Sequence, residues 1–342
     1  MTHFLQKPKA LWQQPLMIAP FLLWGSSMVV MRDTLAETSP LFIAITRLLP
    51  AGILLLAVRY WQGRPQPKGL RNRPWNPMGW RGWLWVALFA LVDGACFQGF
   101  LAEGLGGTGA GLGSVLIDSQ PLAVALMAAW FYQERLGWVG WLSLLVGLAG
   151  ISVIGLSPLM AGGAAMGMDL DGTGWMLLAS LSMAVGTVMV RQVSRYADPV
   201  LATGWHMVIG SLPLIGILMV QGGDPWSQIS PEHWLGLAYT SVLGSALAYG
   251  LFFYFAAVEN LTEFSSLTFL TPVFALIFGG MFLGESLSLP QWLGVGITLL
   301  SVFLINSRFD IEHKIRTGLE NWGKDPQLGP TLEPEMEPID RG

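Results

Sequence analysis

Two fifteen-residue stretches of this 342-residue chain share one pattern, and that pattern decides the fold. QPLAVALMAAWFYQE (residues 120–134) and TPVFALIFGGMFLGE (residues 271–285) both place proline second and glutamate last, with an apolar filling between them. The two stretches lie 151 positions apart. Because one chain carries the same stretch twice, the sequence predicts an internal duplication.

The correspondence extends on both sides of these stretches. At the offset of 151 it runs without a gap over roughly seventy residues and pairs Trp83 with Trp234, Gly99 with Gly250, Ser114 with Ser265, Pro121 with Pro272, Glu134 with Glu285, Trp141 with Trp292 and Ile154 with Ile305. Upstream the offset becomes 159 and pairs Arg32 with Arg191, Pro40 with Pro199 and Arg47 with His206. A longer Pro- and Arg-rich second loop in the first half accounts for the difference.

The composition is that of a membrane protein. Hydrophobic residues make up 53% of the chain and charged residues only 12%, about half of what soluble domains carry. The apolar residues form long runs free of Asp, Glu, Lys and Arg, such as 10–31, 136–168 and 199–223. Since a helix needs roughly 20 apolar residues to cross the hydrocarbon, we expect an all-α, multi-pass membrane protein. The first run is interpreted as a retained helix, not a cleaved signal peptide.

Ten membrane-spanning helices are expected, five in each half. Their predicted ranges are 14–36, 40–61, 80–103, 109–132, 136–156, 173–193, 199–220, 232–256, 262–283 and 287–307. Five is an odd number, so the second half must enter the membrane from the opposite face. The sequence therefore predicts two inverted five-helix repeats, an architecture in which a substrate site lies between the halves.

The distribution of basic residues predicts the orientation. With the amino terminus in the cytoplasm, sixteen of the eighteen Lys and Arg residues lie on the cytoplasmic side, as the positive-inside rule requires. Both termini are then cytoplasmic, in the plasma (inner) membrane. The expected organisation is a cytoplasmic N-terminus (1–13), a first repeat (14–156), a connecting loop (157–172), a second repeat (173–307) and a tail (308–342). Because the tail is acidic and has few apolar groups, we expect it to be disordered.

The doubled pattern resembles the EamA-type branch of the drug/metabolite transporter superfamily. The resemblance rests on Trp24-Gly25 in the first helix, Pro40 and Arg47 in the second, and the two proline-to-glutamate stretches. It covers residues 14–307 and implies secondary transport of small metabolites, often amino-acid export, through a central cavity. The halves differ in polarity, since Asp93 and Asp118 of the first repeat meet Gly244 and Phe269 in the second. The substrate therefore does not follow from the family.

Four ionisable residues within the predicted spans are candidates for the substrate or coupling site. A carboxylate in the middle of a span, such as Asp93, usually faces a wet cavity or a partner. Asp93 is therefore either a proton-coupling or amine-binding group, or a protonated side chain that makes a hydrogen bond between helices. Arg47 and Asp118 are expected at similar depth below the outer surface and can form an ion pair or a gate. Arg47 can instead bind a substrate carboxylate or extend to the outer headgroups. His206 is either a hydrogen-bonded packing residue or a pH-sensitive inner gate.

Five further side chains are expected to face inward, although each has a structural alternative. Ser and Gln also make ordinary interhelical hydrogen bonds, and most tryptophans of such a chain anchor it at the membrane interface. The five are Gln98, Ser119, Gln120, Tyr249 and Trp24.

The residues of the duplicated stretches have predicted structural roles. Glu134 and Glu285 precede the next helix by a residue or two, where an acidic group complements the positive end of the helix dipole. Pro121 and Pro272 should interrupt backbone hydrogen bonding midway along the fourth and ninth helices. The carbonyl groups freed there can line a cavity.

Other chemistries lack support in the sequence. Gly104-Leu-Gly-Gly-Thr-Gly109 fits G-x-G-x-x-G, but no strand-turn-helix unit surrounds it. Cys96 is the only cysteine, and no ligand cluster or nucleophile motif indicates a metal site, a cofactor or an enzyme. We therefore expect a secondary transporter whose partners are a small molecule, protons and the lipid bilayer. The family resemblance implies that it exports its substrate. A multidrug or aromatic-cation efflux pump and an intramembrane enzyme or scaffold are the alternatives.

Overall fold

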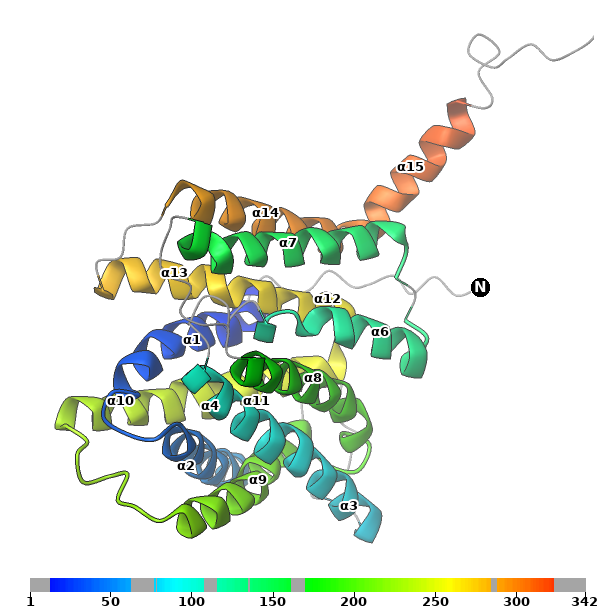
Figure 1. Ribbon diagram of the computed structural model, residues 1–342. Helices are drawn as coiled ribbons and strands as arrows, with labels where there is room; N and C mark the ends of the chain where they lie inside the picture. The colour runs from blue at the N-terminus through cyan, green and yellow to red at the C-terminus, as the bar shows by residue number, and fades with distance from the viewer. Residues whose placement is uncertain are drawn as a thin grey trace, which may run out of the picture.

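The computed structural model describes residues 13–62, 77, 79–107, 116–134, 136–160, 170–283 and 288–322, and within these ranges every regular element is a helix (Figure 1). In chain order the elements are α1 (Gln13–Thr34), α2 (Pro40–Trp61), α3 (Gly79–Phe89), η2 (Ala90–Cys96), α4 (Phe97–Gly107), α6 (Gln120–Tyr132), α7 (Trp138–Met160), α8 (Leu170–Val193), α9 (Pro199–Gln221), α10 (Pro231–Ser241), η3 (Val242–Leu247), α11 (Ala248–Val258), α12 (Leu261–Ser266), η4 (Leu267–Phe269), α13 (Leu270–Leu283), α14 (Leu289–Asn306) and α15 (Arg308–Trp322).

Six helical segments of the described chain are long and apolar enough to cross a membrane: Pro40–Trp61, Gly79–Gly104, Gly172–Val193, Pro199–Gln221, Pro231–Val258 and Leu261–Met281. Four shorter apolar helices cover Pro15–Met31, Gln120–Tyr132, Trp138–Val153 and Leu289–Ile305. These segments lie within the predicted spans or extend them by a few residues. The all-helical prediction is confirmed, and the number of ten crossings stays a prediction.

Several helices begin at the same local signal, a capping side chain followed by proline. The Ser39 hydroxyl accepts from the N–H of Phe42, and the Asp198 carboxylate accepts from the N–H groups of Val200 and Leu201. Proline follows each cap directly, where its missing N–H costs nothing. Ser39 and Asp198 are equivalents at the offset of 159, so the two halves start their second helix in the same way.

The packing of α7 against α14 shows how the halves are related. Gly147 faces Ser301 and Gly150 faces Thr298, so positions rise along one helix as they fall along the other. The two helices are equivalent at the offset of 151. Gly147 then corresponds to Thr298 and Gly150 to Ser301, so each of the two contacts is the equivalent of the other. A twofold axis that relates two antiparallel helices is perpendicular to them. An axis perpendicular to membrane-spanning helices lies in the membrane plane, as inverted repeats require.

The equivalent helices α2 and α9 also pack on each other, at the end of the bundle away from α7 and α14 (Figure 1). Their contact needs glycine, because a Cβ at Gly52 would lie 2.8 Å from the carbonyl oxygen of Gly204. Small residues let helix backbones approach closely in lipid, where helix association depends on packing. Elements from both halves therefore meet along the axis.

Irregular turns occur at equivalent places in the two halves. The π-helices η2 and η3 interrupt the third and eighth spans, and the offset of 151 places one on the other to within a residue. In the fourth span a turn at Asp118 and Ser119 precedes α6, and in the ninth the 3₁₀ turn η4 precedes α13. Pro121 and Pro272 lie in the first turns of α6 and α13, just after these breaks.

One prediction about the tail is wrong for its first part. The composition suggested disorder from residue 308 on, but residues Arg308–Trp322 form the helix α15, which projects from the bundle in Figure 1. Its base is anchored, since Arg308 forms a 3.0 Å ion pair with Glu263 and Glu312 accepts a hydrogen bond from the N–H of Val139. Residues 323–342 lie outside the described residues.

We predict that Gly150→Ala lowers the Tm of the detergent-solubilised protein. The new Cβ would lie 2.5 Å from the hydroxyl of Thr298 and 2.8 Å from its backbone nitrogen, and overpacking of this kind costs about 1–3 kcal/mol. Gly296→Ala is the matched control, because nothing lies within 4 Å of a Cβ there and alanine favours a helix. Equal Tm values for the two variants would contradict the antiparallel contact.

Candidate functional site

Gln98 and Tyr249 mark the centre of the molecule. The Gln98 amide donates to the Tyr249 hydroxyl at 3.0 Å, and both side chains are buried. The two residues are equivalents at the offset of 151. Equivalent residues that touch each other must lie on either side of the twofold axis. This hydrogen bond therefore joins the two halves at the axis, where a transport site is expected.

Asp93 meets His206 close to this centre. The Asp93 Oδ2 atom lies 3.2 Å from His206 Nε2, and both side chains are 1% exposed. Among the described residues, neither carboxylate oxygen of Asp93 makes a hydrogen bond, so this close contact does not have the geometry of a hydrogen bond. The ring of Phe89 packs against the imidazole, with the ring centroids 4.2 Å apart and the planes tilted by 34°, and helps to hold it.

Glycines place the Asp93 carboxylate. Gly94 and Gly210 bring η2 and α9 together, since a Cβ on Gly94 would lie 2.9 Å from the Gly210 Cα. On the opposite side a Cβ on Gly186 of α8 would overlap the Asp93 carboxylate itself. Asp93 lies within the π-helix η2, and π-turns often occur at functional sites. The carboxylate thus fits only because its neighbours on two helices have no side chains.

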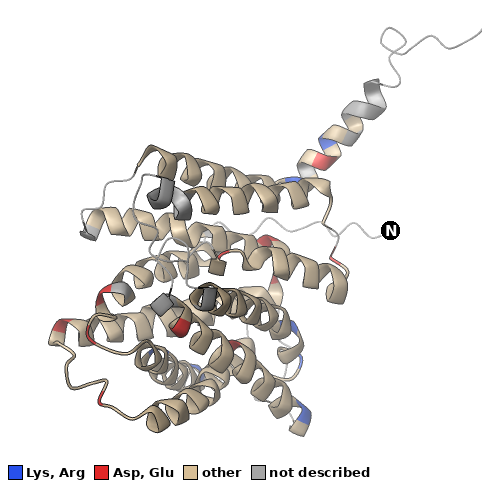
Figure 2. Cartoon of the chain, viewed as in Figure 1, with Lys and Arg blue, Asp and Glu red and all other residues tan. Residues whose placement is uncertain are grey.

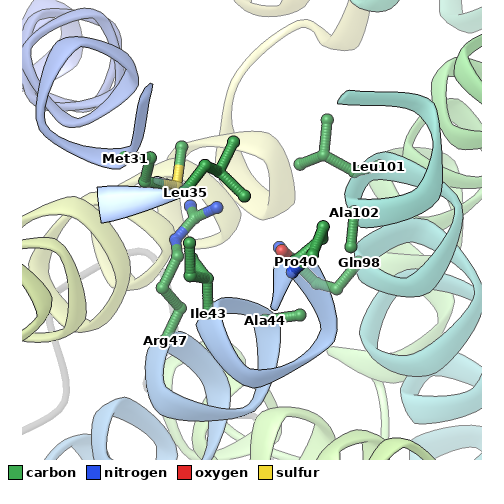
Figure 3. A pocket seen from close by; sticks show the side chains of 9 residues that line it. All are labelled: Met31, Leu35, Pro40, Ile43, Ala44, Arg47, Gln98, Leu101 and Ala102. Atoms are coloured by element: carbon green, nitrogen blue, oxygen red, sulfur yellow. The ribbon is translucent and has the colours of Figure 1, made fainter. Parts of the chain in front are cut away.

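Arg47 lies in α2 and borders a small pocket. Its side chain is 4% exposed, and its Nε donates to the Ser245 hydroxyl at 3.3 Å. In Figure 3 the guanidinium and the Gln98 amide point into the pocket among apolar side chains. The pocket holds about 270 Å³ of space, its open mouth included, and is lined by Met31, Leu35, Pro40, Ile43, Ala44, Arg47, Gln98, Leu101 and Ala102.

The pocket lies toward the end of the bundle that contains the α1–α2 loop. In the other half, the equivalents of Leu101 and Ala102 are Phe252 and Phe253. Both rings are fully buried and pack edge to face at 5.2 Å. The Phe253 ring also lies 5.5 Å from the His206 ring. Aromatic side chains therefore fill on one side the space that stays open on the other.

Asp118 does not pair with Arg47. It is buried in the break of the fourth span, and no cation among the described residues forms an ion pair with it. Its neighbour Ser119 donates to the carbonyl of Leu116 at 2.6 Å, which satisfies one group freed by the break. Ser180 of α8 donates to the carbonyl of Ile117 at 3.3 Å and satisfies another.

Gln120 and Trp24 connect the centre to the surrounding core. The Gln120 amide donates to the Thr268 hydroxyl at 3.5 Å, a long bond that joins the breaks of the fourth and ninth spans. The Trp24 indole is 7% exposed and lies 4.9 Å from the Tyr249 ring. Its position is the aromatic wall of the core and not the membrane interface.

Glu134 caps a helix of the other repeat. Its carboxylate accepts from the N–H groups of Leu261 and Thr262 at the start of α12, and it forms a 2.8 Å ion pair with Arg191. The sequence analysis expected Glu134 to complement the dipole of the helix that follows it in the chain, whereas the N-terminus that it caps is that of α12. Its equivalent Glu285 lies outside the described residues.

An ionic cluster that the sequence analysis missed joins the two halves at the end of the bundle with the α1–α2 loop. His233 Nδ1 lies 2.6 Å from a Glu37 oxygen, and its Nε2 lies 3.3 Å from Asp33. The N–H of Ser230 donates to the same Glu37 oxygen at 2.8 Å. The offsets of 159 and 151 make Tyr196 and Gly82 the equivalents of Glu37 and His233. Tyr196 and Gly82 also lie close to each other, but neither of them carries a charge.

We predict that Glu37→Gln removes a pH-dependent part of the stability. The N–H of Ser230 above all, and then His233, hold the pKa of Glu37 below its ordinary 4.5. A lowered pKa means that the carboxylate stabilises the fold above about pH 4.5 and loses this effect as the pH falls through the lower folded-state pKa. The Tm of Glu37→Gln should therefore lie below wild type at pH 6 and converge on it below pH 4.5.

Asp224→Asn, at an exposed carboxylate of the loop between α9 and α10, is the control for this experiment and should differ little from wild type. A constant Tm difference between Glu37→Gln and wild type from pH 6 to pH 3 would contradict the role given to the carboxylate.

Comparison with known proteins gives relatives along almost the whole chain. An uncharacterized transporter of Synechocystis, sll0355, is 54% identical over 313 residues, which cover 88% of this chain and 91% of that protein. A chloroplastic WAT1-related protein of Arabidopsis thaliana, At3g02690, is 47% identical and covers 85% of this chain and 68% of its own length. The uncharacterized inner membrane transporter YedA of Escherichia coli K12 is 28% identical over 299 residues, which cover 84% of this chain and 89% of that protein.

A solved crystal structure shares the fold with a TM-score of 0.70 at 16% identity, over 85% of this chain and 94% of that chain. The EamA-like transporter family matches residues 11–156 and 171–307, which are the two repeats. The chain therefore belongs to the EamA-like transporter family and is a multi-pass membrane transporter.

Proposed function

We propose that the protein is a secondary transporter that exports small metabolites such as amino acids by alternating access. The observation that supports this most is the set of buried polar side chains where the halves meet. Gln98 hydrogen-bonds its own equivalent Tyr249, and the Asp93–His206 pair joins the third span to the seventh. Polar groups inside a membrane protein are costly and usually belong to a substrate or ion pathway. Here they lie between two units that can move against each other.

The asymmetry along the membrane normal supports an alternating mechanism. The pocket beside Arg47 is open on one side of the Gln98–Tyr249 bond, and the Phe252 and Phe253 rings close the other side. Movement of one half against the other would close the first and open the second.

The orientation proposed from the sequence places both termini in the cytoplasm. Polar contacts between loops join segments that this orientation puts on the same side, such as the α1–α2 loop with Ser230, and Arg59 with Asp198 at 3.1 Å. On the right of Figure 2, basic positions lie where α3 begins, where α8 ends and where α15 leaves the bundle. The positive-inside rule assigns this end to the cytoplasm.

We predict that cysteines placed at Ser227 and Arg195 are labelled from opposite sides. Both residues are exposed in loops, Ser227 between α9 and α10 and Arg195 between α8 and α9. In a Cys96→Ser background, an impermeant maleimide should label Ser227→Cys in intact cells and Arg195→Cys only after the membrane is opened. The Cys96→Ser protein alone is the control. Labelling in the reverse order would invert the proposed orientation.

The Asp93–His206 pair is the proposed coupling element. It offers a carboxylate and an imidazole in contact: protonation of the imidazole creates a pair of opposite charges, and protonation of the carboxylate removes it. The groups that face it from the packed helices are few: α8 presents Gly186, and Tyr249 of α11 interacts electrostatically with both Asp93 and Arg47. In the proposed cycle a proton enters from outside as the metabolite leaves, and the pair releases the proton to the cytoplasm.

We predict that Asp93→Asn uncouples transport. Proteoliposomes with this variant should still exchange labelled for unlabelled amino acid, because the cavity is unchanged in size. Accumulation driven by a pH gradient should fall at least tenfold, because the amide cannot carry the proton. Asp224→Asn, at an exposed loop carboxylate, is the control and should behave as wild type. Full gradient-driven accumulation by Asp93→Asn would remove this pair from the coupling mechanism.

A second candidate function is the efflux of multidrug or aromatic cations. It is favoured by Asp118, which is buried without a described cationic partner, and by the aromatic wall of Trp24, Tyr249 and Phe252. Counterflow with ethidium in place of amino acids distinguishes the two, since each function predicts exchange of its own substrate and not of the other. An intramembrane enzyme or scaffold would exchange neither.

A further inference from the structure

The two halves carry different residues at the same structural position. In one half Asp93 of η2 faces His206 of α9. The offsets of 151 and 159 give their equivalents as Gly244 of η3 and Arg47 of α2. The scaffold around both is alike: Arg47 contacts Ser245, and His206 contacts Gly94, which is the equivalent of Ser245. Arg47 thus has the neighbours that His206 has, except that its carboxylate is missing.

The residue on α1 that faces Gly244 also differs from its equivalent on α8. Asp93 fits because its neighbour on α8 is Gly186, which leaves room for the carboxylate. The equivalent of Gly186 is Ser27 of α1, and a Cβ on Gly244 would overlap the Ser27 hydroxyl. One half therefore pairs Asp with Gly, and the other pairs Gly with Ser. The second arrangement leaves no internal carboxylate for the guanidinium.

Arg47 is consequently a buried cation without an anionic partner among the described side chains. Its recorded neighbours, Ser245 and Tyr249, are neutral acceptors. A guanidinium is always charged, and a buried charge needs a counterion. The pocket beside it is open, and apart from Arg47 and Gln98 its lining is apolar. The guanidinium therefore borders a space that a molecule from outside the chain can reach.

We propose that Arg47 binds the carboxylate of the transported molecule in the pocket that it lines, so that the substrate supplies the anion that Asp93 supplies in the other half. The inference rests on the transport function proposed above and names its substrate class: small carboxylates with an apolar body. Arg binds a carboxylate through two parallel hydrogen bonds, which also fixes its orientation. The apolar body of the substrate contacts Leu35, Ile43 and Leu101, whose side chains line the pocket in Figure 3.

The pocket limits the size of the ligand. Its space of about 270 Å³ includes open solvent at the mouth, so only part of it encloses a ligand. A ligand of this pocket must therefore be small, and a peptide or a nucleotide does not fit. A second anionic group is not expected, because Arg47 is the one cation of the lining.

The first test needs no ligand. The double variant Ser27→Gly/Gly244→Asp rebuilds the Asp93–Gly186 arrangement beside Arg47, with Ser27→Gly alone as the control for the space it creates. The Tm of the double variant should equal or exceed that of Ser27→Gly. In an Arg47→Gln background the same Gly244→Asp change should lower the Tm, because the new carboxylate is buried without a cation. An identical effect in both backgrounds would overturn the inference.

The second test measures binding by the shift in Tm of the purified full chain with four probes of matched shape. These are L-leucine, 4-methylpentanoate, L-leucinamide and isoamylamine. Leucine and 4-methylpentanoate should stabilise wild type and Ser27→Gly, and the other two, which lack a carboxylate, should not. The affinity for both carboxylates should fall at least tenfold in Ser27→Gly/Gly244→Asp and in Arg47→Gln. Stabilisation by neither carboxylate, or equally by isoamylamine, would overturn the inference.

Counterflow in proteoliposomes separates this inference from the proposed function. Carboxylate-dependent binding without counterflow would sustain the Arg47 site and contradict transport. Counterflow of an amine that Arg47→Gln leaves unchanged would sustain transport and contradict the site.

Discussion

A carboxylate inside a membrane must find a partner, and the contact of Asp93 with His206 meets this requirement in a way that depends on the whole fold. A charged side chain at the centre of a span costs about 2.5–3.5 kcal/mol on insertion scales. Asp93 lies in the first repeat and His206 in the second, 3.2 Å apart. The contact forms only because Gly94 and Gly210 let η2 and α9 approach and because Gly186 leaves room on α8. The pair therefore exists only when the halves are packed together.

The scaffold keeps its symmetry where backbones touch and loses it where side chains carry charge. The contacts between α7 and α14, the π-turns η2 and η3 and the Gln98–Tyr249 bond all follow the twofold relation. Charge does not follow it, because Asp93 has Gly244 as its equivalent. Packing constrains glycines and turns in both copies equally, since both must bury the same helices. Site chemistry is needed once, so each copy can diverge there after duplication.

Most of the fold was predictable from the sequence, for a physical reason. A span needs about 20 apolar residues, so hydropathy alone locates it, and Ser39-Pro40 and Asp198-Pro199 give the start of two helices to the residue. The repeat offset identified equivalent residues correctly. It did not give the position of the axis, so Gln98 and Tyr249 were each expected to face inward without being expected to meet.

What the sequence did not predict depends on neighbours that are distant in the chain. Glu134 caps α12, whose N-terminus comes to it only through the tertiary fold. The ionic cluster of Glu37 and His233 joins loops from different halves. The helix α15 was missed because its composition is polar, although its base is held by the Arg308–Glu263 ion pair. Composition reports average solvation and cannot report a single anchoring contact.

The two sides of the central hydrogen bond differ in what must happen when the transporter opens. On the closed side, Phe252, Phe253 and Phe89 pack edge to face, and each such aromatic pair contributes about 0.5–1.5 kcal/mol beyond its buried area. On the open side the equivalent positions of the first two hold Leu101 and Ala102, which leave the pocket beside Arg47. Without substrate, the aromatic contacts favour the conformation that is open on the Arg47 side. In the proposed orientation that side is external, where an exporter driven by entering protons must collect them.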